Sequence, residues 1–401
     1  MKAKHLAVLL TAASALVPFV GPLILEAQPP GPVTRTKRVD CDSGGDLAAA
    51  LALPAQKLVI EISGTCLGDL RIERDHVTLR GVTPGATVEG DPSIPGPTIF
   101  LLGARDVNLE DLTITGDVAG VALRRAAEAQ LLRVQITQTA AVGLQIEQAS
   151  SVVFVDSAST GHGAFGLAVF GESGLTVQGS ANLSGNGAFG LLMSDGASLH
   201  TQGVGQMVAN DNGIAGVSLQ AGASGLFPSV EARRNGFAGL DLTFGGDFVS
   251  IGANDFSENV GFGVFLGDGS SFFGSGLVRD NGMVGIFATE NSHLTIASDV
   301  FTEIGGSPIG LALEGASGFF SFIDFVSPVE LTFGSRASFG PTVTLGTLTC
   351  DGTVLTQGGF SCPPSLRLFE SLPGASVRGL LRDELYRRVA ERRPAGPVLD
   401  F

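Results

Sequence analysis

The sequence has few of the side chains that usually contact sugars, metals or nucleic acids. It contains no tryptophan, a single tyrosine at Tyr386 and only five histidines in 401 residues. Exposed tryptophan and tyrosine rings pack on sugar faces, so their shortage argues against an aromatic-lined carbohydrate groove. Lysine is absent after Lys57, and the formal net charge is −15. Because such a chain repels phosphate backbones and anionic lipids, nucleic acid is not an expected partner.

Long hydrophobic runs are also missing, with one exception at the start of the chain. Residues 6–25 form an apolar run that follows a short basic segment and is interrupted by two prolines and a glycine. These breaks disfavour a stable membrane-spanning helix. The pattern predicts a signal peptide over residues 1–27 and a linker over residues 28–40. We therefore expect a secreted, periplasmic or cell-surface protein with no membrane span after cleavage; an uncleaved anchor is the alternative.

Glycine, by contrast, is abundant, with 57 residues, and it marks an internal repeat. An apolar–Gly–apolar triplet recurs at intervals of 22–26 residues, with its glycine at Gly120, Gly143, Gly166, Gly190, Gly216, Gly239, Gly263, Gly285 and Gly310. After each glycine the residues alternate, so that Leu144 and Ile146 would point inward and Gln145 and Glu147 outward. A period near 23 residues permits three short strands and three turns in each coil. The repeat predicts an all-β fold, a right-handed parallel β-helix over residues 41–362.

A second repeat places an asparagine in the turn before most of these strands. The positions are Asn186, Asn212, Asn235, Asn259 and Asn281. Stacked coils would bring such side chains about 4.8 Å apart. Each amide could then bond the next, which predicts an asparagine ladder. Asparagine and glycine also tolerate the positive φ that such tight turns need.

Each end of the repeat carries its own signals. Residues 46–51 read as a short capped helix that would cover the first coil. Four cysteines fit an oxidising compartment and permit three pairings. One pair lies near each end of the predicted rod, so we expect the bonds Cys41–Cys66 and Cys350–Cys362.

The last segment, residues 363–401, changes character and is predicted to be a helical tail. Val377, Leu381, Leu385 and Val389 recur every four residues among several arginines, as on one side of an amphipathic helix. We expect this helix to dock on the acidic rod. A helix that binds a partner or a membrane is the alternative.

Three segments of the first coils carry a family resemblance. Cys41-Asp-Ser-Gly-Gly-Asp46-Leu, Ile62-Ser-Gly-Thr-Cys66 and Val77-Thr-Leu-Arg-Gly81, together with the coils, resemble the pectate-lyase-like β-helix superfamily over about residues 40–362. The chain looks most like bacterial secreted proteins named only for their right-handed β-helix repeats. The resemblance implies the fold but no single activity, because the superfamily includes pectate lyases, polygalacturonases, alginate epimerases, phage tailspikes and adhesins.

The catalytic groups of the enzymatic members are poorly represented. Gly161-His162-Gly163 matches a polygalacturonase motif, but no paired carboxylates accompany it. His162 also stands one repeat before Asn186, so we expect it at the first position of the ladder. Lyases of this fold use an arginine or lysine base with calcium-binding carboxylates. Arg124 and Glu147 fall on adjacent coils and could form such a site, but a surface ion pair is the simpler interpretation.

No cofactor or metal is predicted, because the histidines are scattered and no cysteine pair has zinc-like spacing. Weak Ca²⁺ binding by acids in the turns is the exception that the sequence allows. These acids are Asp195, Asp211, Asp247, Asp268 and Asp280. Most phenylalanines are expected in the core or the turns, although Phe170 with Leu192, or Phe265 with Phe287, could form an exposed interaction surface.

These observations favour an exported β-helix scaffold, a non-enzymatic binding or structural protein that contacts a polysaccharide or a cell-envelope component. The alternative is a polysaccharide-active lyase, hydrolase or epimerase. Its candidate catalytic residues would be Arg124, Glu147 and His162. An exposed cluster of at least one acid and one cation along the rod would favour the alternative.

Overall fold

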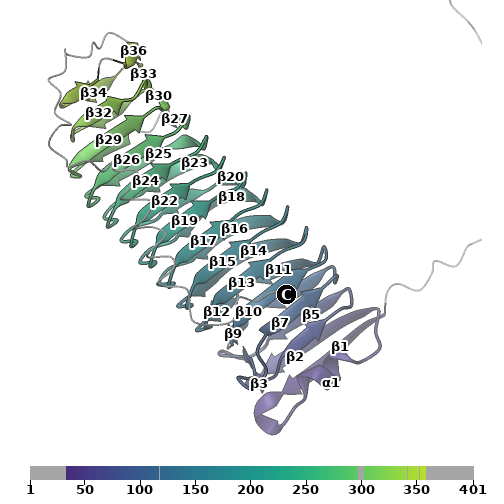
Figure 1. Ribbon diagram of the computed structural model, residues 1–401. Helices are drawn as coiled ribbons and strands as arrows, with labels where there is room; N and C mark the ends of the chain where they lie inside the picture. Colours follow the sequence, from purple (N-terminus) through teal and green to yellow (C-terminus); the bar gives the residue numbers. More distant parts are fainter. Residues whose placement is uncertain (1–32, 117, 297–301, 341, 352, 358–401) are drawn as a thin grey trace, which may run out of the picture.

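The computed structural model describes residues 33–357, except for residues 117, 297–301, 341 and 352. Over these residues the chain winds into a rod of stacked coils whose strands run across the rod axis (Figure 1). All paired strands are parallel and lie in two sheets, a 23-stranded sheet A and a 13-stranded sheet B. The chain is therefore a parallel β-helix, as predicted. The predicted signal peptide, the whole predicted C-terminal tail and Cys362 lie outside the described residues.

Sheet B contains the strands that carry the repeated glycine, which is the second residue of each strand from β10 to β29. Its strands are β4 (Leu70–Ile72), β7 (Pro97–Leu102), β10 (Ala119–Arg124), β13 (Val142–Ile146), β15 (Phe165–Val169), β17 (Phe189–Met193), β19 (Ala215–Leu219), β22 (Ala238–Leu242), β24 (Phe262–Leu266), β26 (Val284–Thr289), β29 (Ile309–Glu314), β32 (Val329–Thr332) and β35 (Leu348–Cys350).

Sheet A forms the remaining wall of each coil. Its strands are β1 (Thr34–Asp40), β2 (Lys57–Ser63), β3 (Thr65–Leu67), β5 (Val77–Gly81), β6 (Thr87–Glu89), β8 (Val107–Glu110), β9 (Thr113–Thr115), β11 (Glu128–Leu132), β12 (Gln135–Thr137), β14 (Ser151–Thr160), β16 (Gly174–Asn182), β18 (Ser198–Val208), β20 (Ser224–Phe227), β21 (Ser229–Glu231), β23 (Asp247–Asp255), β25 (Ser271–Arg279), β27 (His293–Ile296), β28 (Thr302–Gly305), β30 (Ser317–Phe320), β31 (Ile323–Phe325), β33 (Arg336–Phe339), β34 (Val343–Leu345) and β36 (Leu355–Gln357).

The alternating residues of each strand divide between the interior and the outer surface. Leu144 and Ile146 are fully buried in the continuous interior core, whereas Gln145 between them lies on the outer side. The interior also holds stacked aromatic rings on successive coils. The Phe248 ring centroid lies 4.5 Å from that of Phe227 and 5.4 Å from that of Phe272. Burial of this continuous core drives the coils to stack, since no coil could bury its apolar side alone.

The repeated glycine is required by the close approach of neighbouring coils. At Gly166 an added Cβ atom would lie 2.6 Å from the Gly190 carbonyl oxygen and 2.8 Å from Nδ2 of Asn186. Such distances are shorter than real Cβ contacts, so any larger residue would force the coils apart. The triplet is therefore a packing requirement of sheet B.

The first coil is covered by a short helix, α1 (Leu47–Leu51), which follows a 3₁₀ turn, η1 (Cys41–Ser43). The Asp46 carboxylate caps α1 by accepting a hydrogen bond of 2.9 Å from the backbone N–H of Ala49. The Cys41–Cys66 disulfide ties the turn to strand β3. Cys350, in the last coil of sheet B, is buried, and its predicted partner Cys362 lies outside the described residues.

The prediction of a linker over residues 28–40 is wrong for its second half. Residues 34–40 form strand β1, which pairs with β2 in parallel over seven residue pairs. All of these residues except Val39 are exposed, so the segment lacks the apolar alternation that marks a strand in sequence. Strand β1 is held by backbone pairing with β2. Its basic side chains help to keep this edge of sheet A from pairing with another chain.

The repeated asparagines form a continuous row of buried side chains along the turn before sheet B. Asn186 Nδ2 donates to Asn212 Oδ1 over 3.0 Å, and the Asn186 backbone N–H donates to the same oxygen. The next three steps of the row repeat both bonds, at 2.9–3.1 Å. Every step therefore joins two adjacent coils through a side chain and a backbone group.

The positive φ of these turns falls on the residue before each asparagine, not on the asparagine itself. The residues in this conformation are Gly185, Asp211, Arg234, Glu258 and Asp280, with φ between 55° and 72°. The turn therefore accepts charged residues at a position that favours glycine. The asparagines are selected instead for their amide hydrogen bonds.

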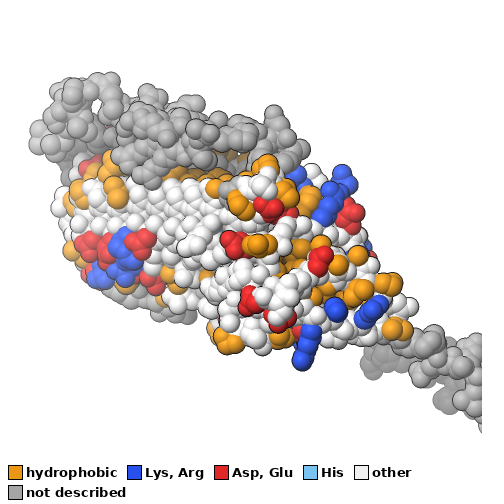
Figure 2. All heavy atoms as spheres, turned by 90° about the horizontal axis from the view of Figure 1, so that it is seen from below, with side chains coloured by type: hydrophobic (Ala, Val, Ile, Leu, Met, Phe, Trp, Pro, Cys, Tyr) orange, Lys and Arg blue, Asp and Glu red, His pale blue; other side chains and the backbone are white. Residues whose placement is uncertain are grey.

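Charged side chains gather on the rod surface in small groups of both signs (Figure 2). Arg234 pairs with Asp211 at 2.8 Å, and Arg233 pairs with Asp255 and Glu258 on the next coil. Such exposed pairs add little stability individually. Within the described residues, no helix is long and apolar enough to cross a membrane.

Candidate functional site

Two arginines and a phenylalanine come together on the outer side of sheet B, near the N-terminal end of the rod. The strand register places Arg71 of β4 beside Phe100 of β7, and Arg124 projects from β10 on the next coil. The guanidinium carbons of Arg71 and Arg124 lie 5.9 Å and 5.8 Å from the centroid of the Phe100 ring. Both distances fall within the range of cation–π attraction. We call Arg71, Phe100, Arg124 and Glu147 the Arg–Phe patch.

An acid completes the Arg–Phe patch. Arg124 Nε lies 3.0 Å from Oε2 of Glu147, on the coil that follows, and the two side chains are only 15% and 22% exposed. Glu147 also accepts a hydrogen bond from Gln145, which holds its carboxylate in place. Arg71, which is 61% exposed, pairs with Glu73 at 2.5 Å. The predicted proximity of Arg124 and Glu147 is thus observed, and a second arginine and an aromatic ring join them.

His162, the third candidate, is buried in the turn before β15 and takes part in the row of amides. The Thr139 backbone N–H donates to its Nδ1 over 3.3 Å, and Ser159 Oγ lies 3.0 Å from its Nε2. Its own backbone N–H donates to Asn186 Oδ1 over 3.1 Å. Nδ1 of His162 therefore accepts a backbone hydrogen bond from the preceding coil, as the asparagine Oδ1 atoms do on the following coils. Burial lowers the pKa of His162 to about 4, so the neutral imidazole is the native form.

Acidification is expected to destabilise the protein through His162. Because the unfolded chain binds a proton near pH 6.5 and the native chain only near pH 4, stability is lost as the pH falls between these values. The loss at pH 4.5 relative to pH 7 should be about 2 kcal/mol larger in the wild type than in His162→Asn. Urea denaturation of both proteins at the two pH values measures this difference. Equal losses would show that the His162 imidazole is not held neutral.

A hollow of about 640 Å³ runs along these turns, but its lining offers little chemistry. Much of the lining is glycine, and His162 and Asn186 present only buried, hydrogen-bonded side chains to it. Asp211, at the rim, is paired with Arg234, which lowers the pKa of the Asp211 carboxyl. Hydrogen-bonded groups of this kind are poor candidates for proton transfer.

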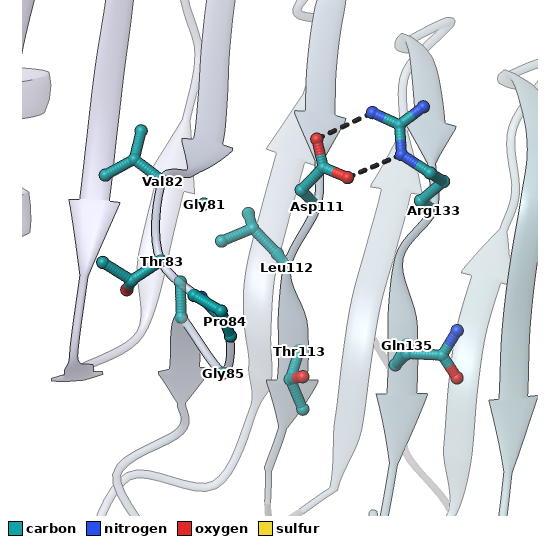
Figure 3. A pocket seen from close by; sticks show the side chains of 11 residues that line it. Gly81, Val82, Thr83, Pro84, Gly85, Asp111, Leu112, Thr113, Arg133 and Gln135 are labelled. Atoms are coloured by element: carbon teal, nitrogen blue, oxygen red, sulfur yellow. Dashed lines mark hydrogen bonds and ion pairs between the residues drawn. The ribbon is translucent and has the colours of Figure 1, made fainter.

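A second hollow, of about 390 Å³, lies beside the loop from Gly81 to Ala86 (Figure 3). Arg133 reaches across its rim and donates to both carboxylate oxygens of Asp111, at 2.6 Å and 2.7 Å. This bidentate contact lowers the pKa of the Asp111 carboxyl and uses its acceptor oxygens. Arg133 and Asp111 thus satisfy each other, and the hollow contains no acid or base available for catalysis.

A buried acid on the outer side of sheet B was overlooked in the sequence. Asp241 of β22 is 4% exposed and accepts a 2.9 Å hydrogen bond from Ser218 Oγ, to which Gln220 also donates. Among the described atoms its Oδ1 has no hydrogen-bond partner. Burial raises the pKa of Asp241 to about 6. A signal was present, since Asp241 is the only acid at the central outward positions from β10 to β29.

The residues described here provide no group of three histidine, cysteine, aspartate or glutamate side chains that could hold a metal ion. Weak Ca²⁺ binding by the acids of the turns therefore stays a prediction. The Arg–Phe patch is the described site that combines cations, an acid and an aromatic ring.

Comparisons with known proteins give similar solved structures but no relative by sequence. No protein-family model and no curated protein matches the sequence. Among solved structures, the chain is similar to the A-module of mannuronan C-5 epimerase AlgE6 from Azotobacter vinelandii, with 15% identity, a TM-score of 0.47, and 79% of this chain and 93% of that chain covered. It is also similar to pectate lyase Pel9A, with 11% identity, a TM-score of 0.44, and 86% and 84% covered.

A third similar structure is full-length tailspike protein 2 from Escherichia coli O157:H7 bacteriophage CAB120. The identity is 11%, the TM-score is 0.37, and 74% of this chain is covered. The chain spans 38% of the length of that tailspike. The coils themselves establish that this chain is a parallel β-helix, and these similarities add no further conclusion.

Proposed function

We propose that this chain is a polysaccharide-active β-helix protein that works outside the cytoplasm, and that it holds an anionic polysaccharide against the Arg–Phe patch. The observation that carries the proposal is the placement of two guanidinium groups, those of Arg71 and Arg124, on either side of the Phe100 ring. The Cys41–Cys66 disulfide supports an oxidising compartment.

The chemistry of the patch suits a sugar that carries carboxylates. A guanidinium can donate two parallel hydrogen bonds to a carboxylate. Strands β4 and β10 are two coils apart, which separates the two cations by about 10 Å along the rod, close to the length of two linked sugar rings. A partly exposed phenylalanine between them, Phe100, can pack on a sugar face. The chain is strongly acidic overall, so a polyanion needs a local concentration of cations of this kind.

A second function, lyase or epimerase turnover of the same polymer, is supported by the Arg124–Glu147 contact. Both reactions begin when a base takes the proton α to the sugar carboxylate. Arg71 or Arg124 would neutralise that carboxylate, and Glu147 is the acid of the patch that could accept the proton. The preference for a non-enzymatic scaffold weakens accordingly, because an exposed acid and cation, Glu73 and Arg71, do lie together along the rod.

Replacing Arg124 with alanine should weaken the binding of sodium polygalacturonate or alginate at least ten-fold, because one of the two carboxylate donors is lost. Isothermal titration calorimetry of the full chain measures the change. Arg336→Ala, at an exposed arginine on sheet A, is the matched control and should bind like the wild type. Equal weakening in the control, or no binding of either polymer by the wild type, would contradict the proposal.

The same mixtures separate recognition from turnover. Release of unsaturated uronates, followed by their ultraviolet absorbance, indicates a lyase. A change in uronate stereochemistry, followed by nuclear magnetic resonance, indicates an epimerase. Binding without either change leaves recognition as the function.

A further inference from the structure

Beyond the Arg–Phe patch, the outer side of sheet B becomes mainly apolar. From β15 to β29 it carries a second apolar cluster that is separate from the interior core. Its aromatic members are Phe165, Phe189, Phe237, Phe262, Phe265 and Phe287. Every member of the cluster belongs to a strand of sheet B or to the residue just before one. We call this surface the phenylalanine face.

Side chains of the phenylalanine face point away from the coil interior and yet are buried. Phe287 is 4% exposed, although Ile286 and Ala288 on either side of it fill the interior. Phe262 is fully buried, and its ring centroid lies 5.7 Å from that of Phe287. Ala215, Ser218 and Asp241 are buried on the same side. The outer side of a solenoid strand faces water unless another layer covers it. The burial of so many outward positions therefore points to a covering segment.

Acids on the same side of sheet B need a cation or a donor. Asp241 sits within the phenylalanine face with its Oδ1 unpartnered among the described atoms. Further along, Glu314 of β29 and Glu330 of β32 lie on adjacent coils. Burial raises the pKa of both carboxyls, and the proximity of Glu330 raises that of Glu314 further. A covering segment with positive charge would match these acids.

The chain itself supplies a segment of this chemistry beyond the last described residue. Residues 358–401 contain seven arginines and five acids, in a protein with an overall charge of −15. The apolar residues that recur every four positions from Val377 to Val389 could pack against the rings of the phenylalanine face. A helix over residues 377–393 would be about 25 Å long, and the phenylalanine face extends about 29 Å across seven strands. The segment follows β36, in the terminal coils next to this face, so it can reach it.

We propose that residues 358–401 lie across the phenylalanine face, with their apolar stripe against the rings and one of their arginines donating to Asp241. The segment then covers β15 to β29. This inference does not depend on the proposed function, because it concerns other strands of the sheet.

The single tyrosine provides a direct test. The chain has no tryptophan, so tyrosine fluorescence reports on Tyr386 alone. In the full-length wild type, the acrylamide quenching constant of Tyr386 should be at least three-fold lower than in the urea-unfolded protein. Asp241→Arg places a cation beneath the arginine-rich segment and should raise the quenching constant towards the unfolded value.

A control and a second variant keep the result interpretable. Glu128→Arg makes the same charge change at an exposed position on sheet A and should leave the quenching constant unchanged. Phe265→Glu alters the half-buried edge of the phenylalanine face and should release Tyr386 as Asp241→Arg does. Circular dichroism confirms that each variant is folded.

Several outcomes would overturn the proposal. Tyr386 could be quenched as readily in the native wild type as in the unfolded protein. Tyr386 could stay protected in both Asp241→Arg and Phe265→Glu. Protection that appears only at concentrations where analytical ultracentrifugation shows a dimer would assign the phenylalanine face to a second copy of the chain.

Discussion

Replacing Phe248 with alanine is expected to lower the free energy of unfolding by about 4 kcal/mol, the range observed for buried phenylalanines. The ring is fully buried and stacks between Phe227 and Phe272 on the neighbouring coils. It also meets Phe256 edge to face, with ring centroids 6.1 Å apart. The substitution removes apolar burial, opens a cavity and breaks a column of rings. Denaturant titration followed by circular dichroism measures the loss.

The control for Phe248 lies on the strand that pairs with its own. Phe273 of β25 is 43% exposed on the outer side, so Phe273→Ala should change the free energy of unfolding by less than about 0.5 kcal/mol. A loss below about 1 kcal/mol in Phe248→Ala would contradict the role given to the ring column. Rigid coils cannot easily collapse into the space, because their backbones are fixed by hydrogen bonds on both sides.

Replacing Asn235 with alanine should cost about 3 kcal/mol, although its side chain is small and polar. Asn235 Oδ1 accepts from the backbone N–H and the Nδ2 of Asn212, at 2.9 Å and 3.1 Å. Its Nδ2 donates to Asn259 Oδ1 over 3.0 Å. The substitution therefore leaves buried donors on one coil and a buried acceptor on the next without these partners. Such groups cost more to leave unpaired than an average hydrogen bond contributes.

Asn182→Ala provides the comparison for Asn235. Asn182 of β16 is exposed, and its amide oxygen accepts one hydrogen bond, from the Ser184 backbone N–H. Its loss should change the free energy of unfolding by less than about 1 kcal/mol, because water can take over the bond. Equal effects at the two positions, measured by urea titration, would show that the buried row contributes no more than a surface turn.

The architecture could be predicted because one local pattern repeats along the chain. The alternation after each glycine gives the inward side of sheet B, and the interval between glycines gives the pairing of Leu144 with Leu167 on the next coil. The same interval predicts that Arg124 and Glu147 meet. Where a repeat is regular, sequence distance converts directly into spatial distance.

The remaining features depend on contacts that have no local signal. Arg71 and Phe100 pair across 29 residues, outside the regular interval, so their meeting with Arg124 could not be read from the repeat. The burial of Asp241 could not be predicted either. The alternation within its strand shows only that its side chain points away from the interior. Whether an outward residue meets water or another layer depends on distant parts of the chain.

The hydrogen bonds that define this rod have a final consequence for its length. Backbone ladders and the row from Asn186 to Asn281 join each coil to the next in the same way. Excising one whole interval, such as the 24 residues between His162 and Asn186, would therefore bring equivalent groups back into register. Coils act as interchangeable units, and the rod can change length only in steps of about 4.8 Å. An insertion of another size must form a loop outside the coil, and a deletion of another size must shorten a turn. The length of the rod is therefore set by its number of coils.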